Sequence, residues 1–109
     1  MDINGYRTMW IFVEFDLPTE TKKNKKDYTK FRKHLLEDGF TMFQYSIYIR
    51  HCPSKENKDV HLSRIKKTIP KDGNVVIFSL TDKQFEMMEV FNGKKRINTP
   101  KPFEQIELF

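Results

Sequence analysis

The stretch from residue 8 to residue 18 constrains the fold of this chain most, because it has the pattern of a β-strand that packs on a core. Successive strand residues point to opposite faces of a sheet. One face of this stretch is entirely apolar and consists of Met9, Ile11, Val13 and Phe15. The other begins with aromatic residues and ends with acids, in the order Trp10, Phe12, Glu14 and Asp16. We therefore predict a strand that ends at an acid, just before Pro18.

Asp16 has two interpretations. Asp often begins a turn, and Pro18 follows closely, so this residue can serve the turn alone. An acid at a strand end, beside a loop, is also a common position for a chemically active side chain. The strand pattern leaves both interpretations open.

Composition limits the classes of protein to consider. A chain of 109 residues makes one small domain, and 20 Lys and Arg against 15 Asp and Glu give a net charge of +5. That charge suits a polyanion partner without requiring one. The single Cys52 excludes an intramolecular disulfide and a multi-cysteine zinc site, and fits a reducing compartment. With no membrane-length apolar run and no signal peptide, we expect a cytoplasmic protein without a membrane partner.

A helix is predicted after the strand, with Thr19 or Thr21 as its cap and Gly39 after its last turn. Its apolar stripe is formed by Tyr28, Phe31, Leu35 and Leu36. The opposite face is basic. Such runs are often only solvated surface, but clustered cations on one helix are also the electrostatic footprint of phosphate binding. The predicted nucleic-acid-binding residues are Lys22, Lys23, Lys25, Lys26, Lys30 and Lys33.

Residues 40–50 have the composition of one long strand, with a bulge or bend near Ser46. Ser46 either satisfies nearby backbone groups or places its hydroxyl beside the Asp16 strand. The adjacent His51 and Cys52 point to opposite faces of that strand, which argues against a shared metal ion.

The second half of the chain predicts a helix from Ser54 to Pro70 and then more strands. The stripe of that helix is Leu62, Ile65 and Ile69, with Val60 at its edge. His61 is expected to be partly exposed and without an orienting partner. Residues 75–80 are predicted to form a central strand and residues 85–91 another, followed by a turn at Asn92 and Gly93.

This order of elements predicts an α+β domain of the ferredoxin-like class over residues 1–102, with an antiparallel βαββαβ sheet and two helices on one face. An additional C-terminal strand at residues 103–109 needs a sheet edge, in this chain or in a partner. The aromatic face with Trp10 and Phe12 would be bare, so we expect a second copy to cover it. Two copies of Asp16 near the two-fold axis would repel each other unless a cation such as Mg²⁺ lay between them and activated water.

Five features together resemble the small CRISPR-associated adaptation protein, a ferredoxin-like endoribonuclease family and the partner of the CRISPR integrase. They are the strand ending Phe15-Asp16, the basic segment 17–23, the segment from Gly39 through Gln44-Tyr45-Ser46-Ile47-Tyr48, the strand 75–80 and the ending 103–109. The basic loop and the ending resemble members from type II systems, which have a single large effector nuclease. The resemblance covers nearly the whole chain, except residues 1–6.

The resemblance implies a homodimer with Asp16 as a catalytic Mg²⁺ ligand for cleaving RNA or DNA. It also implies a scaffold that bridges integrase dimers and holds double-stranded DNA for insertion, with single-stranded RNA as a further substrate. The segment with Phe103, Ile106, Leu108 and Phe109 would bind the integrase. Some members carry Arg in the loop after the Asp, whereas this loop is rich in Lys and lacks planar bidentate clamping of phosphate.

The alternative is a ferredoxin-like regulatory or RNA-binding module without nuclease activity. No glycine-rich or acidic ligand loop supports the regulatory module, and the basic-Gly-aromatic signature of an RNA-recognition strand is absent.

Overall fold

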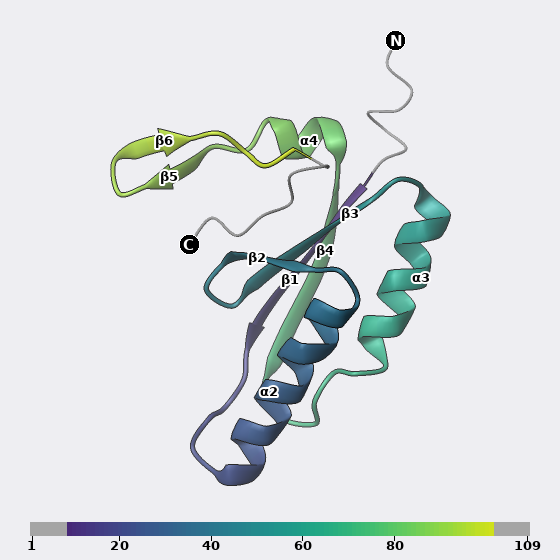
Figure 1. The fold of residues 1–109 in the computed structure, drawn as a ribbon, viewed down its shortest axis with the longest axis vertical. Helices are drawn as coiled ribbons and strands as arrows, with labels where there is room; N and C mark the ends of the chain where they lie inside the picture. The colour runs from purple at the N-terminus through teal and green to yellow at the C-terminus, as the bar shows by residue number, and fades with distance from the viewer. Residues whose placement is uncertain (1–8, 102–109) are drawn as a thin grey trace.

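A four-stranded antiparallel sheet organises residues 9–101, the part of the chain that this computed structural model describes (Figure 1). Its strands are β1 (Met9–Asp16), β2 (Thr41–Gln44), β3 (Ile47–Cys52) and β4 (Asn74–Thr81), in the order β2-β3-β1-β4. β1 is central and pairs antiparallel with both β3 and β4. With α2 (Lys22–Glu37) and α3 (Lys55–Lys66), this is the predicted βαββαβ arrangement. Residues 103–109, and with them the predicted C-terminal strand, lie outside the described residues.

Both long helices cover one face of the sheet, as predicted (Figure 1). The core on that side joins the apolar face of β1 to α2 and α3. Phe31 and Leu35 of α2 and Ile65 of α3 are almost completely buried against Ile11, Val13 and Phe15. Burying a side chain of this size contributes roughly 1.5–3 kcal/mol, so this layer fixes the helices on β1. The predicted stripes are partly wrong, because Leu36, Val60 and Ile69 are exposed.

The aromatic face of β1 is covered by the chain itself, which corrects the expectation of a bare face. After β4 the chain forms the short helix α4 (Asp82–Glu86) and the hairpin of β5 (Val90–Asn92) and β6 (Lys95–Ile97). The Phe85 ring stacks on Trp10 with centroids 3.9 Å apart, and both side chains are buried. Trp10 Nε1 also donates a hydrogen bond of 2.8 Å to Asp82 Oδ1. Residues 85–91 are therefore not one strand, because Phe85 lies in a helix that packs on Trp10.

Two other strand predictions need correction. Residues 40–50 form a hairpin rather than one strand, because the chain reverses at Tyr45 and Ser46 between β2 and β3. β4 is an edge strand rather than a central one, and its side chains Val76 and Phe78 are exposed. Its apolar run had suggested burial on both faces. The turn at Asn92 and Gly93 is confirmed, as the connection of the β5–β6 hairpin.

The ends of the two long helices follow the predicted capping chemistry. Thr21 caps α2 by accepting a hydrogen bond from the Asn24 N–H at 3.0 Å, and Ser54 caps α3 in the same way. Gly39 follows α2 with φ of 85°, and a Cβ there would collide with the Arg50 guanidinium. α3 ends at Lys66, before the predicted stop at Pro70. No helix within residues 9–101 is long and apolar enough to cross a membrane.

Candidate nucleic-acid interface

Asp16 lies at the end of β1, exposed, on the sheet face opposite α2 and α3. It pairs in register with Asn74 at the start of β4. Gly73, just before Asn74, has φ of 97°, and a Cβ on it would come within 2.9 Å of the Asp16 carbonyl oxygen. Only glycine lets the loop before β4 approach the backbone so closely. The pairing with Asn74 and the close approach of Gly73 therefore fix the end of β1, while the Asp16 carboxylate is open to solvent.

The β2–β3 turn closes the other side of this strand end. Ser46 has φ of 66°, a left-handed conformation that non-glycine residues adopt uncommonly. Its carbonyl oxygen accepts a hydrogen bond of 3.0 Å from the Phe15 N–H. This bond uses the main chain of Ser46 and not its hydroxyl, and it places Ser46 and Tyr45 next to Phe15 and Asp16.

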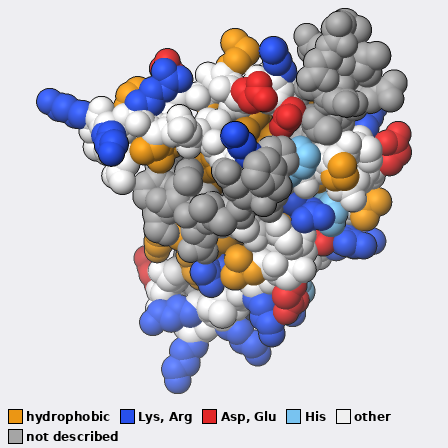
Figure 2. Space-filling view, turned by 45° about the horizontal axis from the view of Figure 1, so that its top comes forward, with side chains coloured by type: hydrophobic (Ala, Val, Ile, Leu, Met, Phe, Trp, Pro, Cys, Tyr) orange, Lys and Arg blue, Asp and Glu red, His pale blue; other side chains and the backbone are white. Residues whose placement is uncertain are grey.

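The predicted lysines of α2 all lie on its exposed surface. Lys23 pairs with Asp27 at 3.1 Å and Lys33 with Glu37 at 3.8 Å, both one turn apart. Within residues 9–101 no acidic side chain forms an ion pair with the other four, which are Lys22, Lys25, Lys26 and Lys30. We call the six lysines the α2 basic face. Figure 2 shows Lys and Arg side chains gathered over the end of the molecule where α2 begins, and a separate group over the β5–β6 hairpin. Such a concentration of unneutralised cations attracts polyanions.

Two further lysines, from outside α2, lie close to the α2 basic face. Lys67 and Lys71, from the connection between α3 and β4, face Lys23, Lys30 and His34 across a groove of about 530 Å³. The ferredoxin-like topology explains this approach, because it returns the chain after α3 to the end of the sheet where α2 begins. Neither lysine belongs to α2, so only the topology of the fold shows that they approach it.

His61 was predicted to be partly exposed and without an orienting partner, and both expectations are wrong. Its side chain is buried, and Nδ1 lies 2.7 Å from Asp38 Oδ2. Asp38 Oδ1 also accepts a hydrogen bond of 3.1 Å from the Arg64 guanidinium. These contacts join the end of α2 to α3. Arg64 and His61 lie three residues apart, on one side of α3, which explains why they share one carboxylate.

His51 and Cys52 lie on opposite faces of β3, as predicted. Cys52 is completely buried, and burial raises the pKa of its thiol to about 11. The thiol is therefore protonated and unreactive at neutral pH. Burial lowers the pKa of His51, partly offset by Asp82, whose Oδ1 lies 3.7 Å from His51 Nε2. These residues are far along the strand from Asp16, since β1 pairs His51 with Trp10 at its other end.

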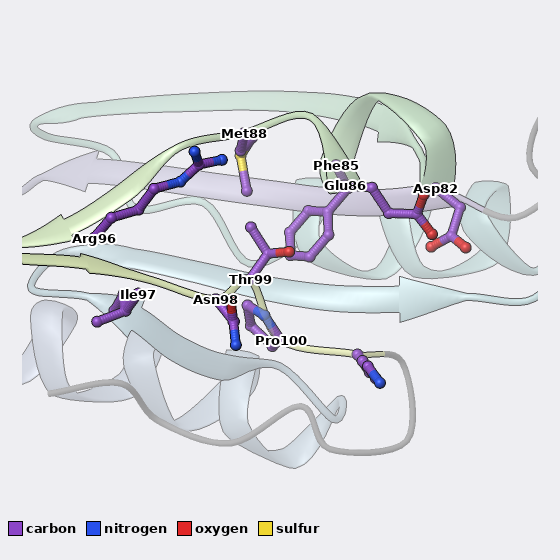
Figure 3. A pocket seen from close by; sticks show the side chains of 10 residues that line it. Asp82, Phe85, Glu86, Met88, Arg96, Ile97, Asn98, Thr99 and Pro100 are labelled. Carbon is purple, nitrogen blue, oxygen red and sulfur yellow. The ribbon is translucent and has the colours of Figure 1, made fainter.

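A pocket of about 370 Å³ lies between α4 and the segment that follows β6 (Figure 3). In Figure 3 Asp82 and Glu86 approach it from α4, while Thr99 and Pro100 lie across from Phe85. Carboxylates and the cations Arg96 and Lys101 line it together. Its apolar lining residue Phe85 belongs to the buried cluster that contains Trp10. The mixture of charges does not favour an anionic ligand, so this pocket is a weaker candidate for a nucleic-acid site than the α2 basic face.

A metal site is incomplete within the described part of one chain. No group of three or more His, Cys, Asp or Glu side chains is arranged to hold a metal ion within residues 9–101. Asp16 therefore offers one exposed carboxylate. This donor suits Mg²⁺, which takes one or two carboxylates together with water and phosphate oxygens. The arrangement fits a weakly held ion that needs a substrate or a second carboxylate, and not a closed metal cage.

Comparison with known proteins adds a family to this geometry. The family model described as CRISPR associated protein Cas2 matches residues 9–88. A protein of Flavobacterium psychrophilum named CRISPR-associated endoribonuclease Cas2 is 56% identical over 107 residues, covering 98% of this chain and 93% of that protein.

Two more distant relatives carry the same name. The protein of Parvibaculum lavamentivorans is 50% identical over 101 residues, covering 93% of this chain and all of the relative. That of Streptococcus mutans strain UA159 is 38% identical over 87 residues, covering 80% of each chain. The likeness therefore extends over the sheet, both long helices and the Asp16 strand.

Proposed function

Because this chain belongs to the Cas2 family, whose members act in CRISPR adaptation, we propose that it binds double-stranded DNA through the α2 basic face during spacer acquisition. The observation that carries the proposal is the group of four lysines on α2 that no acidic side chain of the described residues neutralises. Each lysine that contacts a phosphate releases a condensed counterion, which is the main source of sequence-independent affinity for DNA. Lys67 and Lys71 extend the same surface.

The test replaces lysines in pairs. Lys25→Gln with Lys26→Gln should weaken the binding of duplex DNA, because both side chains are exposed on the proposed surface. Lys94→Gln with Lys95→Gln is the matched control, since it removes the same charge from the exposed β5–β6 hairpin. Equal affinities for the two double variants would show that only net charge matters and would contradict a site on α2.

The family context also supports a homodimer that bridges integrase dimers. β4 is an edge strand, and two of its own side chains, Val76 and Phe78, expose 54% and 41% of their surface. A strand with an unpaired backbone edge and exposed apolar side chains pairs readily with another chain. The segment with Phe103, Ile106, Leu108 and Phe109 is the proposed integrase contact. It lies outside the described residues and stays a prediction.

A second activity, phosphodiester cleavage, is favoured by the exposed Asp16 and by the relatives, which are named endoribonucleases. The Asp16 carboxylates of the two protomers would together hold one Mg²⁺, which would supply charge stabilisation and an activated water. Asp16 itself would bind and orient the ion. Asp16→Asn should abolish cleavage of RNA and leave the affinity for duplex DNA unreduced. Cleavage at an undiminished rate would remove Asp16 from the mechanism.

A further inference from the structure

Tyr45 is exposed to an extent that its role in the fold does not explain. It exposes 81% of its surface, more than any other large hydrophobic side chain within residues 9–101. It lies at the tip of the β2–β3 hairpin, where an Asn or Gly would make a tight turn at a lower conformational cost. Because most of the Tyr45 ring contacts water, it gains little hydrophobic stabilisation and contributes little to the stability of the fold.

The backbone holds Tyr45 at the end of β1. Ser46, the next residue, adopts φ of 66°, which costs energy for a residue with a Cβ. The hydrogen bond of 3.0 Å from Phe15 N–H to the Ser46 carbonyl oxygen fixes this conformation. Phe15 immediately precedes Asp16. The exposed ring is therefore attached to the strand end that carries the candidate catalytic acid.

A second aromatic residue, Tyr28 of α2, lies near Tyr45. Tyr28 packs against Phe15 with ring centroids 5.8 Å apart. Partial burial raises the pKa of the Tyr28 phenol, and the neighbouring Tyr45 phenol raises it further. The turn between β2 and β3, bonded to β1 through Ser46, limits where the Tyr45 ring can lie. This restriction reduces the entropy that the ring would lose on binding a ligand.

Cations lie on the same side of α2. Arg32 is one turn after Tyr28, and its Nε donates a hydrogen bond of 2.7 Å to the Tyr48 hydroxyl. Its guanidinium carbon lies 6.0 Å from the centre of the Tyr48 ring. Arg32 is thereby fixed in place, and Lys25 lies almost one turn before Tyr28. Exposed aromatic rings beside fixed cations are the pattern that binds single-stranded nucleic acids, through base stacking and phosphate contacts.

We propose that Tyr45 is a base-stacking contact for single-stranded nucleic acid beside Asp16, with Arg32 and Lys25 close to the neighbouring phosphates. The inference rests on the proposed nucleic-acid binding and deepens it, because it adds to the shared Lys25 a contact, the Tyr45 ring, that only unpaired strands can use. Bases of a duplex are stacked on each other and paired, so they cannot cover the Tyr45 ring. A single strand can do so without any particular sequence.

The experiment measures affinity for a short single strand, as RNA and as DNA, and for the duplex of the same sequence. Tyr45→Ala should weaken binding of the single strand about 5- to 150-fold, the usual range for loss of one stacked base. Tyr45→Phe keeps the ring and should bind like the wild type. Phe91→Ala is the control, because Phe91 is another exposed ring (48%) on the distant β5–β6 hairpin.

The proposal is supported if only Tyr45→Ala loses affinity, and only for the single strand. It is overturned if Tyr45→Ala binds the single strand like the wild type, if it weakens duplex binding equally, or if the wild type does not bind single strands. None of these results affects the α2 basic face, which the Lys25 and Lys26 double variant tests on duplex DNA alone. A thermal unfolding curve of Tyr45→Ala confirms that the variant is folded.

Discussion

The contact between the buried His61 and the half-buried Asp38 joins α2 to α3 through one carboxylate. Asp38→Ala should lower the free energy of unfolding by about 1–3 kcal/mol, because it leaves the buried His61 without its partner. Urea denaturation measures the difference. Asp59→Ala is the control on α3, where an exposed Asp pairs only weakly with Lys58 at 3.9 Å. Equal losses for both variants would contradict a specific role for the buried pair.

The chemical reactivity of the single cysteine, Cys52, is a second property that can be tested at the level of one residue. Burial raises the pKa of its thiol to about 11, so the reactive thiolate is scarce at neutral pH and increases only in alkaline solution. The native protein should therefore resist iodoacetamide near neutral pH and react quickly once urea unfolds it. Mass spectrometry of the alkylated protein follows both rates. Rapid labelling of the native protein would show that the thiol is accessible.

Single residues were predictable where the signal is local. The position of Asp16 at the end of its strand follows from neighbouring residues and is confirmed, and Thr21, one of the two predicted candidates, caps α2. The burial of His61 was not predictable in this way, because its partner Asp38 lies 23 positions earlier. Periodicity along α3 does not show which side chain of another helix will approach it.

Among the elements, α4 has the clearest structural role, since it covers the aromatic face of β1. Phe85→Ala should cost about 3–5 kcal/mol of unfolding free energy, because Phe85 is buried and stacked on Trp10. Trp10 is the only tryptophan, so its fluorescence emission should shift to longer wavelength as water reaches the ring. Met87→Ala, at an exposed position next to α4, should change neither quantity. Unchanged emission in Phe85→Ala would show that another element covers Trp10.

The long elements were predictable and the short ones were not. α2 has a cap, a stripe and a terminal glycine, which are three independent signals for one helix. α4 has only five residues, too few for a periodic pattern. The β2–β3 hairpin was missed because its turn contains Tyr45 and Ser46 rather than the usual Asn and Gly.

At the scale of the whole molecule, the original reason for a dimer was wrong, because Trp10 and Phe12 are covered within the chain. The edge strand β4 supplies a different reason. Val76→Asp should shift the protein toward the monomer, since it places a charge beside the exposed edge. Sedimentation velocity measures the mass, and Val60→Asp on α3 is a control of similar exposure. A monomeric wild type would contradict the proposed homodimer.

The central claim is that the α2 basic face contacts phosphates of duplex DNA. The most direct measurement is the slope of log affinity against log salt concentration for the wild type and the two lysine double variants. Each phosphate contact contributes about 0.9 to the steepness of this slope. We predict that Lys25→Gln with Lys26→Gln makes the slope shallower by up to about 1.8, whereas Lys94→Gln with Lys95→Gln leaves it unchanged. An unchanged slope in the α2 variant, or equal changes in both, would contradict the claim.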